Sequence, residues 1–316
     1  MTDPLSDVLR SVRLAGGLFL EADFTAPWCV AAQITPADCK PFLANLVQVI
    51  GYHVVLEGRM RVSLEGETPI ELRAGEIILF PRNDLHTMAS GAGVVPVSAA
   101  DLIQQSPEGG LLKIRHGGGR ERTSIVCGFL GTQDSFNPLL ATLPRILRLD
   151  ISKAASRDWV ETSVRFAAAE IIRGRLASSD VMTRLSEVLL VEAVREYIAT
   201  LGDRDQGWLK GLSDPHIGRA LALIHGDVAA PWSAETLARE VGLSRSTFMD
   251  RFAQLIGMPP IRYLTVWRLE IAKRHLRESR MSIPQIAAAV GYESEEGFRR
   301  AFKREFEIWP AEWRNA

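Results

Sequence analysis

The 316-residue chain lacks the features of several protein classes. Its three cysteines, Cys29, Cys39 and Cys127, are odd in number and far apart, with no CxxC pair, so neither a disulfide framework nor a zinc knuckle is indicated. Residues 1–14 carry acids where a signal peptide needs a basic start and an apolar core, and no run reaches the ~18 apolar residues of a membrane span. We therefore expect a cytoplasmic protein with free thiols.

The chain also lacks a large net charge of either sign. It has 37 Lys and Arg against 38 Asp and Glu, and a net charge of −1 by itself argues against a nucleic-acid partner. The charge is uneven, however, because residues 217–316 carry 15 basic and 12 acidic side chains, a net charge of +3. The C-terminal third is the basic part of a chain long enough for about two domains.

Residues 18–130 are rich in short apolar runs separated by Gly, Pro and Asn. Two examples are NLVQVIGYHVVLEG (45–58) and EIILFPRND (76–84). Several short strands at close spacing favour a sandwich or a small barrel. We therefore predict a β-domain over residues 1–135.

From about residue 134 the apolar residues recur every three or four positions, which indicates helices at 159–176 and 181–201. In the second helix, apolar side chains nearly surround the axis, so burial on more than one side is expected. Two interpretations remain open: an ordinary packed helix, or a helix that pairs two subunits. We expect residues 136–205 to be a helical connecting or dimerisation region and GDRDQGW (202–208) to be a linker.

Residues 237–264 and 286–314 form an internal near-repeat. Each copy has a short helix, a glycine where the chain must turn sharply, a serine that can cap the next helix, and two phenylalanines four residues apart. The offset is 49 residues before the turn and 50 after it, so the second turn has one extra residue. The pattern predicts two helix-turn-helix units joined by a long helix over about 261–278, which could place the second helices one duplex turn, ~34 Å, apart.

The second copy carries the motif VGYES-x3-F-x3-F-K-x6-P-x2-W, from Val290 to Trp313. On this motif, residues 217–316 resemble the DNA-binding domain of the AraC/XylS family of bacterial transcriptional regulators, with helix-turn-helix units at about 233–256 and 282–306. The segments YHVVLEG and LRAGEIILFPRNDLH are similar to the cupin-bearing subgroup of that family. The resemblance implies an α+β multidomain fold: an N-terminal cupin-like β-barrel, then a helical segment, then an all-α double helix-turn-helix domain.

In the family, outward positions of the second helix of each unit read base edges. Carried onto this chain, the base-reading residues are Arg245, Ser246, Met249 and Asp250 in the first unit and Glu295, Glu296, Arg299 and Arg300 in the second. Phosphate contacts are expected from Lys303 and Arg304, with Arg268, Lys273 and Arg274 as further candidates. Because Asp250 is acidic, we expect less direct readout from the first unit.

The family's cupin domains can hold a metal, and His53, Glu57 and His86 match three of the four ligand positions, while Gly51 stands at the fourth. Three interpretations stay open: histidines hydrogen-bonded to backbone or to each other, an effector pocket, or a metal site that lacks one of its four ligands. Trp28, Phe80 and Tyr52 are candidates to line such a pocket. We predict no cofactor.

Together these features predict a sequence-specific transcription regulator that binds double-stranded promoter DNA, is controlled by a small-molecule effector and is not an enzyme. A homodimer is expected, and RNA polymerase is a partner if the protein is an activator. The alternatives are a metal-dependent cupin enzyme with a helical assembly domain, and a helical domain that binds other proteins. The glutamates at 295 and 296 fit a DNA-reading helix, because carboxylates are favoured in its first turn and support arginines four residues later.

Overall fold

The computed structural model describes residues 14–35, 39, 46–104, 112–132, 138–150, 179–202 and 207–315. These residues form two compact units. One contains the strands with helices α3 and α6, and the other contains α4 and α7 to α14. The helix predicted at 159–176 lies outside the described residues. Within the described part of the chain, no helix combines the length and the hydropathy needed to cross a bilayer.

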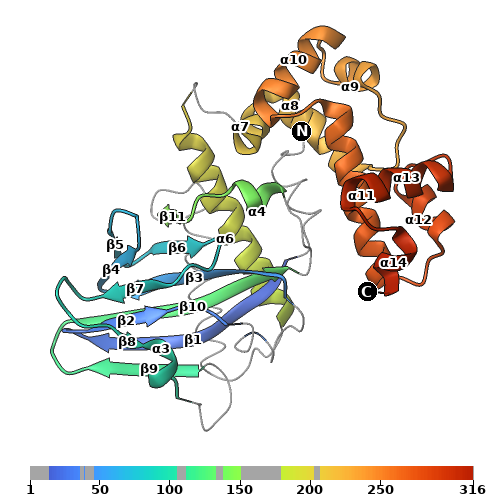
Figure 1. The fold of residues 1–316 in the computed structure, drawn as a ribbon. Helices are drawn as coiled ribbons and strands as arrows, with labels where there is room; N and C mark the ends of the chain where they lie inside the picture. Colours follow the sequence, from blue (N-terminus) through green and yellow to red (C-terminus); the bar gives the residue numbers. More distant parts are fainter. Residues whose placement is uncertain are drawn as a thin grey trace. The chain divides into compact units, whose positions relative to one another are not determined.

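The first unit consists of two facing sheets (Figure 1). The six-stranded sheet has the order β11-β6-β3-β10-β1-β9, and the five-stranded sheet has the order β5-β4-β7-β2-β8. The elements are β1 (Ala15–Thr25), β2 (Cys29–Ala32), β3 (Gln48–Glu57), β4 (Arg59–Leu64), β5 (Ile70–Arg73), β6 (Glu76–Phe80), β7 (His86–Ala89), β8 (Val97–Ser98), α3 (Ala99–Leu102), β9 (Leu112–Gly117), β10 (Arg122–Thr132), β11 (Leu147–Asp150) and α6 (Ser179–Thr200).

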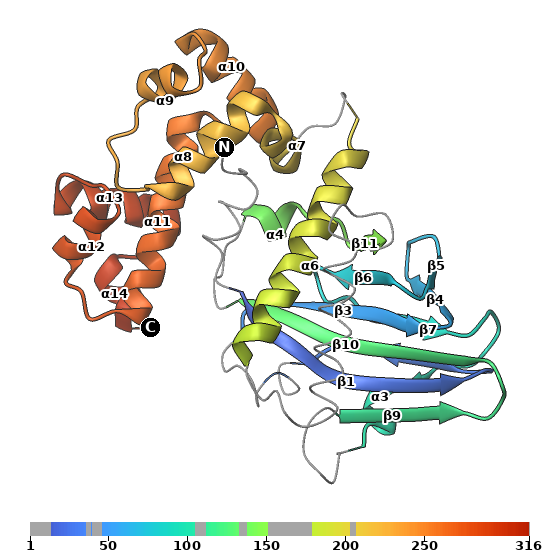
Figure 2. The same cartoon turned by 180° about the vertical axis from the view of Figure 1, so that it is seen from behind.

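The central strands of the six-stranded sheet are buried on both faces. On one face, Val55, Ile125 and Phe129 join the core between the sheets. On the other face, the Tyr52 hydroxyl lies 2.7 Å from Ser186 Oγ of α6, which crosses β1 and β10 in Figure 2. Because both faces are covered, β3 reads in sequence as a nearly continuous apolar run instead of an alternating one.

Of the sandwich and the small barrel that the strand pattern allowed, the structure has the sandwich form. The described strands form two separate sheets, with β11 and β9 outermost in one and β5 and β8 outermost in the other. A closed barrel and two facing sheets place alternate side chains inward in the same way, so the strand pattern could not decide between them.

The region 136–205, expected to be helical, contains the strand β11. It pairs with β6, buries Leu147 and Leu149, and lets Arg148 bond to the Glu76 carboxylate. Four residues of alternating pattern are too short to stand out beside the helical spacing that surrounds them. Residue spacing alone therefore missed this strand.

Helix α6 buries one face on the sheet through residues such as Leu185, Leu189 and Ala193. Val188 and Val191 are half-buried on its remaining surface. Met182 is also among the apolar residues that the sequence places around this helix, and its side chain lies outside the described residues. The packed-helix interpretation is confirmed for one face, and the dimerisation interpretation stays a prediction.

The second unit is entirely helical in its described residues. Its helices are α4 (Pro138–Thr142), α7 (Trp208–Ser213), α8 (Pro215–Gly226), α9 (Ala234–Glu240), α10 (Arg245–Ile256), α11 (Pro260–Glu278), α12 (Ile283–Ala289), α13 (Glu295–Phe306) and α14 (Pro310–Asn315). Phe248 and Phe252 of α10 are fully buried, and Phe298 and Phe302 of α13 form the core of the second helix-turn-helix unit with α11 and α12. The long helix α11 runs between the pairs α9–α10 and α12–α13 (Figure 1).

Candidate nucleic-acid interface and sensor cavity

The two interhelical turns have the predicted chemistry. Gly242 and Gly291 adopt left-handed conformations with φ of 73° and 82°. Ser244 Oγ accepts from the Thr247 N–H and Ser294 Oγ accepts from the Gly297 N–H, both at 3.2 Å. Both predicted helix caps are therefore confirmed. The extra turn residue is confirmed as well, because residues 241–244 separate the first pair of helices and 290–294 the second.

The opening of α12 is confirmed as a capping box. Ser282 Oγ accepts from the Gln285 N–H at 3.4 Å, and the Gln285 side chain accepts from the Ser282 N–H at 2.8 Å. Two N–H groups that the helix itself cannot satisfy thus gain partners. The first helix-turn-helix unit has the same arrangement between Ser233 and Thr236 at the start of α9.

The predicted base-reading side chains lie on the outer faces of α10 and α13. In α10, Arg245, Ser246 and Asp250 are exposed and Met249 is half-buried. In α13, Glu296, Arg299, Arg300 and Arg304 are exposed, while Glu295 and Lys303 are half-buried. Each helix therefore has an apolar face on the core and a polar face directed outward, as a helix that enters a groove requires.

The two glutamates at the start of α13 pair with the two arginines one turn later. The Glu295 carboxylate contacts the Arg299 guanidinium, and Glu296 Oε1 lies 3.5 Å from Arg300 Nη1. Both pairs have the Glu-then-Arg order that supports a helix, and the carboxylates lie near the positive end of the helix dipole. The predicted pairing of these acids with the arginines four residues later is confirmed.

Two of the five predicted phosphate-contacting cations are held inside the unit. Lys273 Nζ lies 2.9 Å from Glu270 and above the Phe306 ring, and its side chain is 13% exposed. Arg268 donates to two backbone carbonyls and burial lowers its pKa. The helical wheel did not reveal the carbonyl partners of Arg268 or the ring beneath Lys273, because Val228, Ala230 and Phe306 are distant in the sequence, although Glu270 is only three residues from Lys273.

Both reading helices are tied to the rest of the unit by arginine–carboxylate pairs that sequence reasoning missed. Arg251 of α10 bonds to Asp214, whose other oxygen caps α8 by accepting from the His216 and Ile217 N–H groups. Arg262 of α11 makes two bonds, of 2.6 and 3.0 Å, to Glu305 of α13. These partners are 37 and 43 residues apart, so no local pattern could reveal them.

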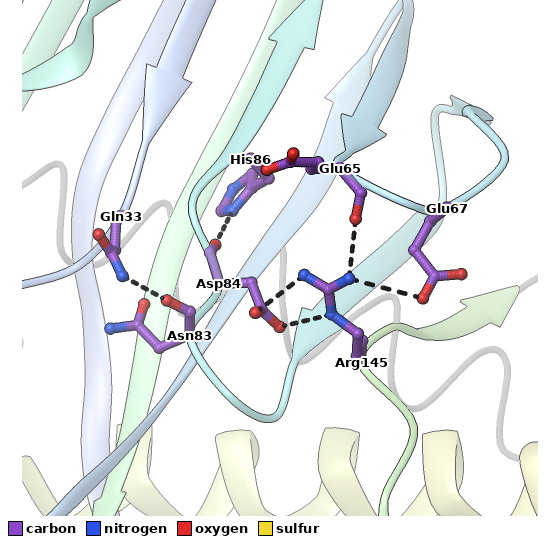
Figure 3. A network of polar contacts seen from close by, with 7 residues as sticks. All are labelled: Gln33, Glu65, Glu67, Asn83, Asp84, His86 and Arg145. Atoms are coloured by element: carbon purple, nitrogen blue, oxygen red, sulfur yellow. Dashed lines mark hydrogen bonds and ion pairs between the residues drawn. The ribbon is translucent and has the colours of Figure 1, made fainter.

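In the unit that contains the two sheets, His53 and His86 meet in the space between those sheets. His86 Nδ1 lies 2.8 Å from the Asp84 carbonyl, which can only accept, so this nitrogen carries the proton (Figure 3). His53 Nε2 is 2.8 Å from His86 Nε2 and therefore donates to it. His53 Nδ1 then accepts from the Cys127 thiol at 3.0 Å. The histidines form a directed hydrogen-bond chain that ends on backbone.

The surroundings keep every member of this chain neutral. Burial, and then the neighbouring His86, hold the pKa of His53 well below its usual value. Burial lowers the pKa of His86 to about 4 and raises that of Cys127 to about 12. A thiol with such a raised pKa is a poor nucleophile. This hydrogen-bond chain is therefore a structural element of the sandwich interior at neutral pH.

Arg145 holds the loop that supplies the Asp84 carbonyl. Its guanidinium donates to Asp84 Oδ1 at 3.1 Å and to the Glu65 carbonyl at 2.8 Å (Figure 3). The loop between β6 and β7 is thus tied to the turn between β4 and β5. This fixes the acceptor that decides which nitrogen of His86 carries the proton.

A cavity of about 60 Å³ lies beside the histidines. It is lined by Leu20, Ala22, Phe24, Val30, Ala32, Gln33, Ile34, His53, His86, Met88, Ala99, Ala100, Ile103, Ile114 and Cys127. Two of the predicted pocket residues stack on residues of this lining. The ring centroids of Phe80 and His86 are 3.7 Å apart, and those of Trp28 and Phe24 are 4.1 Å apart. Tyr52 points to the opposite face of its sheet.

The three residues left from the family's metal ligands do not fit a metal as arranged. Glu57 lies outside the cavity, 59% exposed and 3.6 Å from Arg122. The His53 and His86 Nε2 atoms point at each other, whereas two imidazoles on one tetrahedral zinc at ~2.0–2.1 Å would be roughly 3.3 Å apart. Among the described residues, no group of three or more His, Cys, Asp or Glu could hold a metal ion.

Comparisons with known proteins place this arrangement in a family. A family profile described as Cupin matches residues 3–199, and one described as Helix-turn-helix domain matches residues 237–316. An AraC-like transcription regulator of Streptomyces lividans is 30% identical over 315 residues, which cover 99% of this chain and 98% of the relative. The chain belongs to the cupin-bearing AraC family of DNA-binding transcription regulators.

A further relative and a solved structure are also similar to this chain. The HTH-type transcriptional regulator AlkR of Acinetobacter baylyi is 31% identical to the AraC-family chain over 270 residues, covering 83% of this chain and 86% of AlkR. The DNA-binding domain of AdpA, solved with a target DNA, is 31% identical and covers 32% of this chain and 91% of that domain, with a TM-score of 0.31. The fold class expected from the sequence, a cupin-like sheet domain followed by a helical helix-turn-helix domain, is confirmed.

Proposed function

We propose that this AraC-family regulator grips promoter DNA with both reading helices, α10 and α13, and that α13 contributes more of the base readout. The observation that carries this proposal is the outer face of α13, where Glu295 and Glu296 hold Arg299 and Arg300. An arginine can pair with guanine O6 and N7, and a glutamate can accept from cytosine N4. On α10, Arg245, Ser246 and Asp250 offer fewer donors.

The proposed division of labour assigns residues 217–316 to DNA binding, residues 1–135 to sensing, and residues 136–205 to connection and pairing of subunits. Phosphate contacts fall to Lys303, Arg304 and Arg274, together with the N–H groups at the starts of α10 and α13. Such contacts position the protein on the duplex without reading its sequence. If the regulator activates transcription, RNA polymerase is a further partner.

The test is a selection of genomic DNA fragments with the purified full-length protein, followed by footprinting on the enriched fragment. We expect one enriched motif with two protected stretches about 10 bp apart, and binding that weakens steeply with salt. Without enrichment above bulk DNA, the sequence-specific grip is wrong. A single protected stretch would assign the readout to one unit only.

We further propose that a small-molecule effector enters the sandwich beside His53 and His86. Its binding favours one arrangement of the sheet-containing unit and the helical unit. The cavity of about 60 Å³ has room for about two waters, so a larger effector must widen it. A ligand screen by thermal shift, repeated on His86→Gln, tests this proposal. Ligands that stabilise both proteins equally would bind elsewhere.

Regulation without catalysis is part of the same proposal. It is supported by the neutral histidine chain and by the outward position of Glu57. The check is metal analysis of the purified protein with His53→Ala as the control. A stoichiometric transition metal that is lost in the variant would favour the cupin-enzyme alternative.

A further inference from the structure

Arg268, near the middle of α11, joins parts of both helix-turn-helix units. Its Nε donates to the Val228 carbonyl at 2.9 Å and its Nη2 to the Ala230 carbonyl at 2.7 Å. Both carbonyls belong to the segment that leads from α8 into α9, the first helix of the first unit. A charged donor with two carbonyl acceptors in a half-buried site makes stronger bonds than neutral pairs do.

The acceptor segment is itself held in shape. Asp227 Oδ1 accepts from the Ala230 N–H at 3.1 Å, and the Asp227 carbonyl accepts from the Trp232 indole N–H at 2.9 Å. The two carbonyls are thus presented to Arg268 by a turn with its own bonds. Ser233, the next residue, caps α9, so a fixed turn means a fixed start for the first unit.

The same guanidinium also lies against the turn of the second helix-turn-helix unit. A Cβ placed on Gly291 would be 2.6 Å from Arg268 Nη2 and 2.8 Å from the Ala229 carbonyl oxygen. Gly291 separates α12 from α13, and its lack of a side chain lets the two turns touch. At the matching Gly242 a Cβ would meet nothing within 4 Å. The close approach is therefore a property of this junction and not of the motif.

We infer that Arg268 is a positioning residue that sets the spacing of the two reading helices and hence the separation of the two half-sites the protein accepts. This rests on the proposed function, in which both units contact DNA. Two linked binding modules gain affinity only when their geometry matches the span between their sites. One inserted base pair moves a half-site by ~3.4 Å and ~35° around the duplex, so a rigid junction rejects it.

The experiment uses the full-length protein and the selected operator, with zero, one or two base pairs inserted or removed between the protected stretches. Wild-type protein is expected to lose at least tenfold in affinity per inserted base pair. Arg268→Met is expected to bind the unaltered operator about tenfold more weakly and to bind all spacings within about threefold of one another. The slope of log affinity against log salt stays the same, because Arg268 neutralises no phosphate.

Arg268→Lys separates positioning from charge. It keeps the cation but cannot make both bonds to Val228 and Ala230, so it is expected to behave like Arg268→Met. If Arg268 contacted phosphate instead, lysine would preserve binding, and methionine would lower the salt slope by about 0.9 on every spacing. Arg277 lies in α11 like Arg268, and its guanidinium stacks on Trp313 of α14. Arg277→Met is therefore the matched control and should keep the wild-type spacing preference.

Each outcome decides the inference. A wild-type spacing preference that survives in Arg268→Lys overturns it. If wild-type protein itself shows no spacing preference, the two-unit grip of the proposed function fails instead. Circular dichroism melting of each variant confirms folding; should Arg268→Met not fold, Arg268→Lys and Arg268→Gln carry the test.

Discussion

Gly242 and Gly291 occupy the same turn in the two helix-turn-helix units, with φ of 73° and 82°. Around Gly242 there is open space, whereas Gly291 touches the Ala229 carbonyl and Arg268. The first glycine is needed for its backbone conformation alone, and the second also because no side chain fits. A repeated motif thus kept one residue type for two different physical reasons.

The C-terminal ends of the two reading helices differ in the opposite sense. The residue that caps the C-terminal end of α10 is Gly257 and that of α13 is Glu307, and both are left-handed, with φ of 81° and 61°. A glutamate pays a steric cost there that glycine does not. Lys303 donates to the Glu307 carbonyl and so offsets part of that cost. At this position the first helix-turn-helix unit has the residue whose backbone conformation is unstrained.

The largest expected effect contrasts the two turn glycines. Gly291→Ala should lower the free energy of unfolding by about 3 kcal/mol, because a left-handed alanine is strained and its Cβ collides with backbone. Gly242→Ala should cost about 1 kcal/mol, from strain alone. Urea unfolding followed by tryptophan fluorescence measures both variants. Equal losses would show that the junction around Gly291 yields without cost.

The next effect contrasts the reading faces. Arg300→Ala is expected to weaken binding to the selected operator by about 1–3 kcal/mol, because a paired base donor is lost. Arg245→Ala should cost less than about 1 kcal/mol, since the outer face of α10 is the weaker reader. Titration with operator and with unrelated DNA separates specific from general binding. Larger losses for Arg245→Ala would reverse the proposed ranking of the units.

A smaller effect concerns Asp214, which the first unit uses to hold α10. Burial alone would raise the pKa of Asp214, but the bonds from Arg251 and from the Ile217 and His216 N–H groups outweigh it and lower the pKa. A lowered carboxyl pKa stabilises the fold above the unfolded-state value of ~3.9, and this stabilisation is lost as pH falls through the folded-state pKa. Asp214→Asn, which keeps the cap, should cost about 1 kcal/mol at pH 7.

Urea midpoints measured from pH 7 down to pH 2 check this prediction. The difference between wild type and Asp214→Asn should shrink as the pH falls below about 4. Glu305→Gln, which breaks the corresponding tie of α13 to Arg262, is the matched variant in the second unit. A constant difference across the range would mean that the Asp214 charge does not stabilise α10.

The smallest effect contrasts the helix ends. Glu307→Gly should raise stability by about 0.5 kcal/mol, because glycine adopts the left-handed conformation without strain, although it loses more entropy on folding. Gly257→Ala should lower stability by about 1 kcal/mol for the converse reason. Thermal melting of both variants gives the signs. A destabilised Glu307→Gly would show that the glutamate side chain contributes more than its backbone costs.

Local features were largely readable from the sequence. The caps at Ser244, Ser282 and Ser294 and the pairing of Glu296 with Arg300 depend on residues three or four positions apart, where helix geometry fixes the contact. The position of Arg268 on α11 was equally predictable, but its function was not. An exposed-looking cation on a helical wheel gives no sign of carbonyls supplied from 38 and 40 residues away.

In the sheet unit, sequence reasoning identified His53 and His86 but not what they do. The bond of His53 to Cys127 joins residues 74 apart in sequence, and Glu57 faces outward despite its correct motif spacing. Strand alternation says which side chains share a face. It does not say whether sheets close into a barrel or which facing side chain completes a site.

The sequence by itself determined the two helix-turn-helix units and the caps that start their helices, because short-range geometry encodes these. Its resemblance to a known family supplied the class of protein and the order of the domains. Only the tertiary structure decided that the two sheets stay separate and that His53 and His86 form a neutral hydrogen-bond chain. It also decided that Arg268 joins the two helix-turn-helix units. These outcomes depend on burial and on partners far away in the chain, and no local periodicity records them.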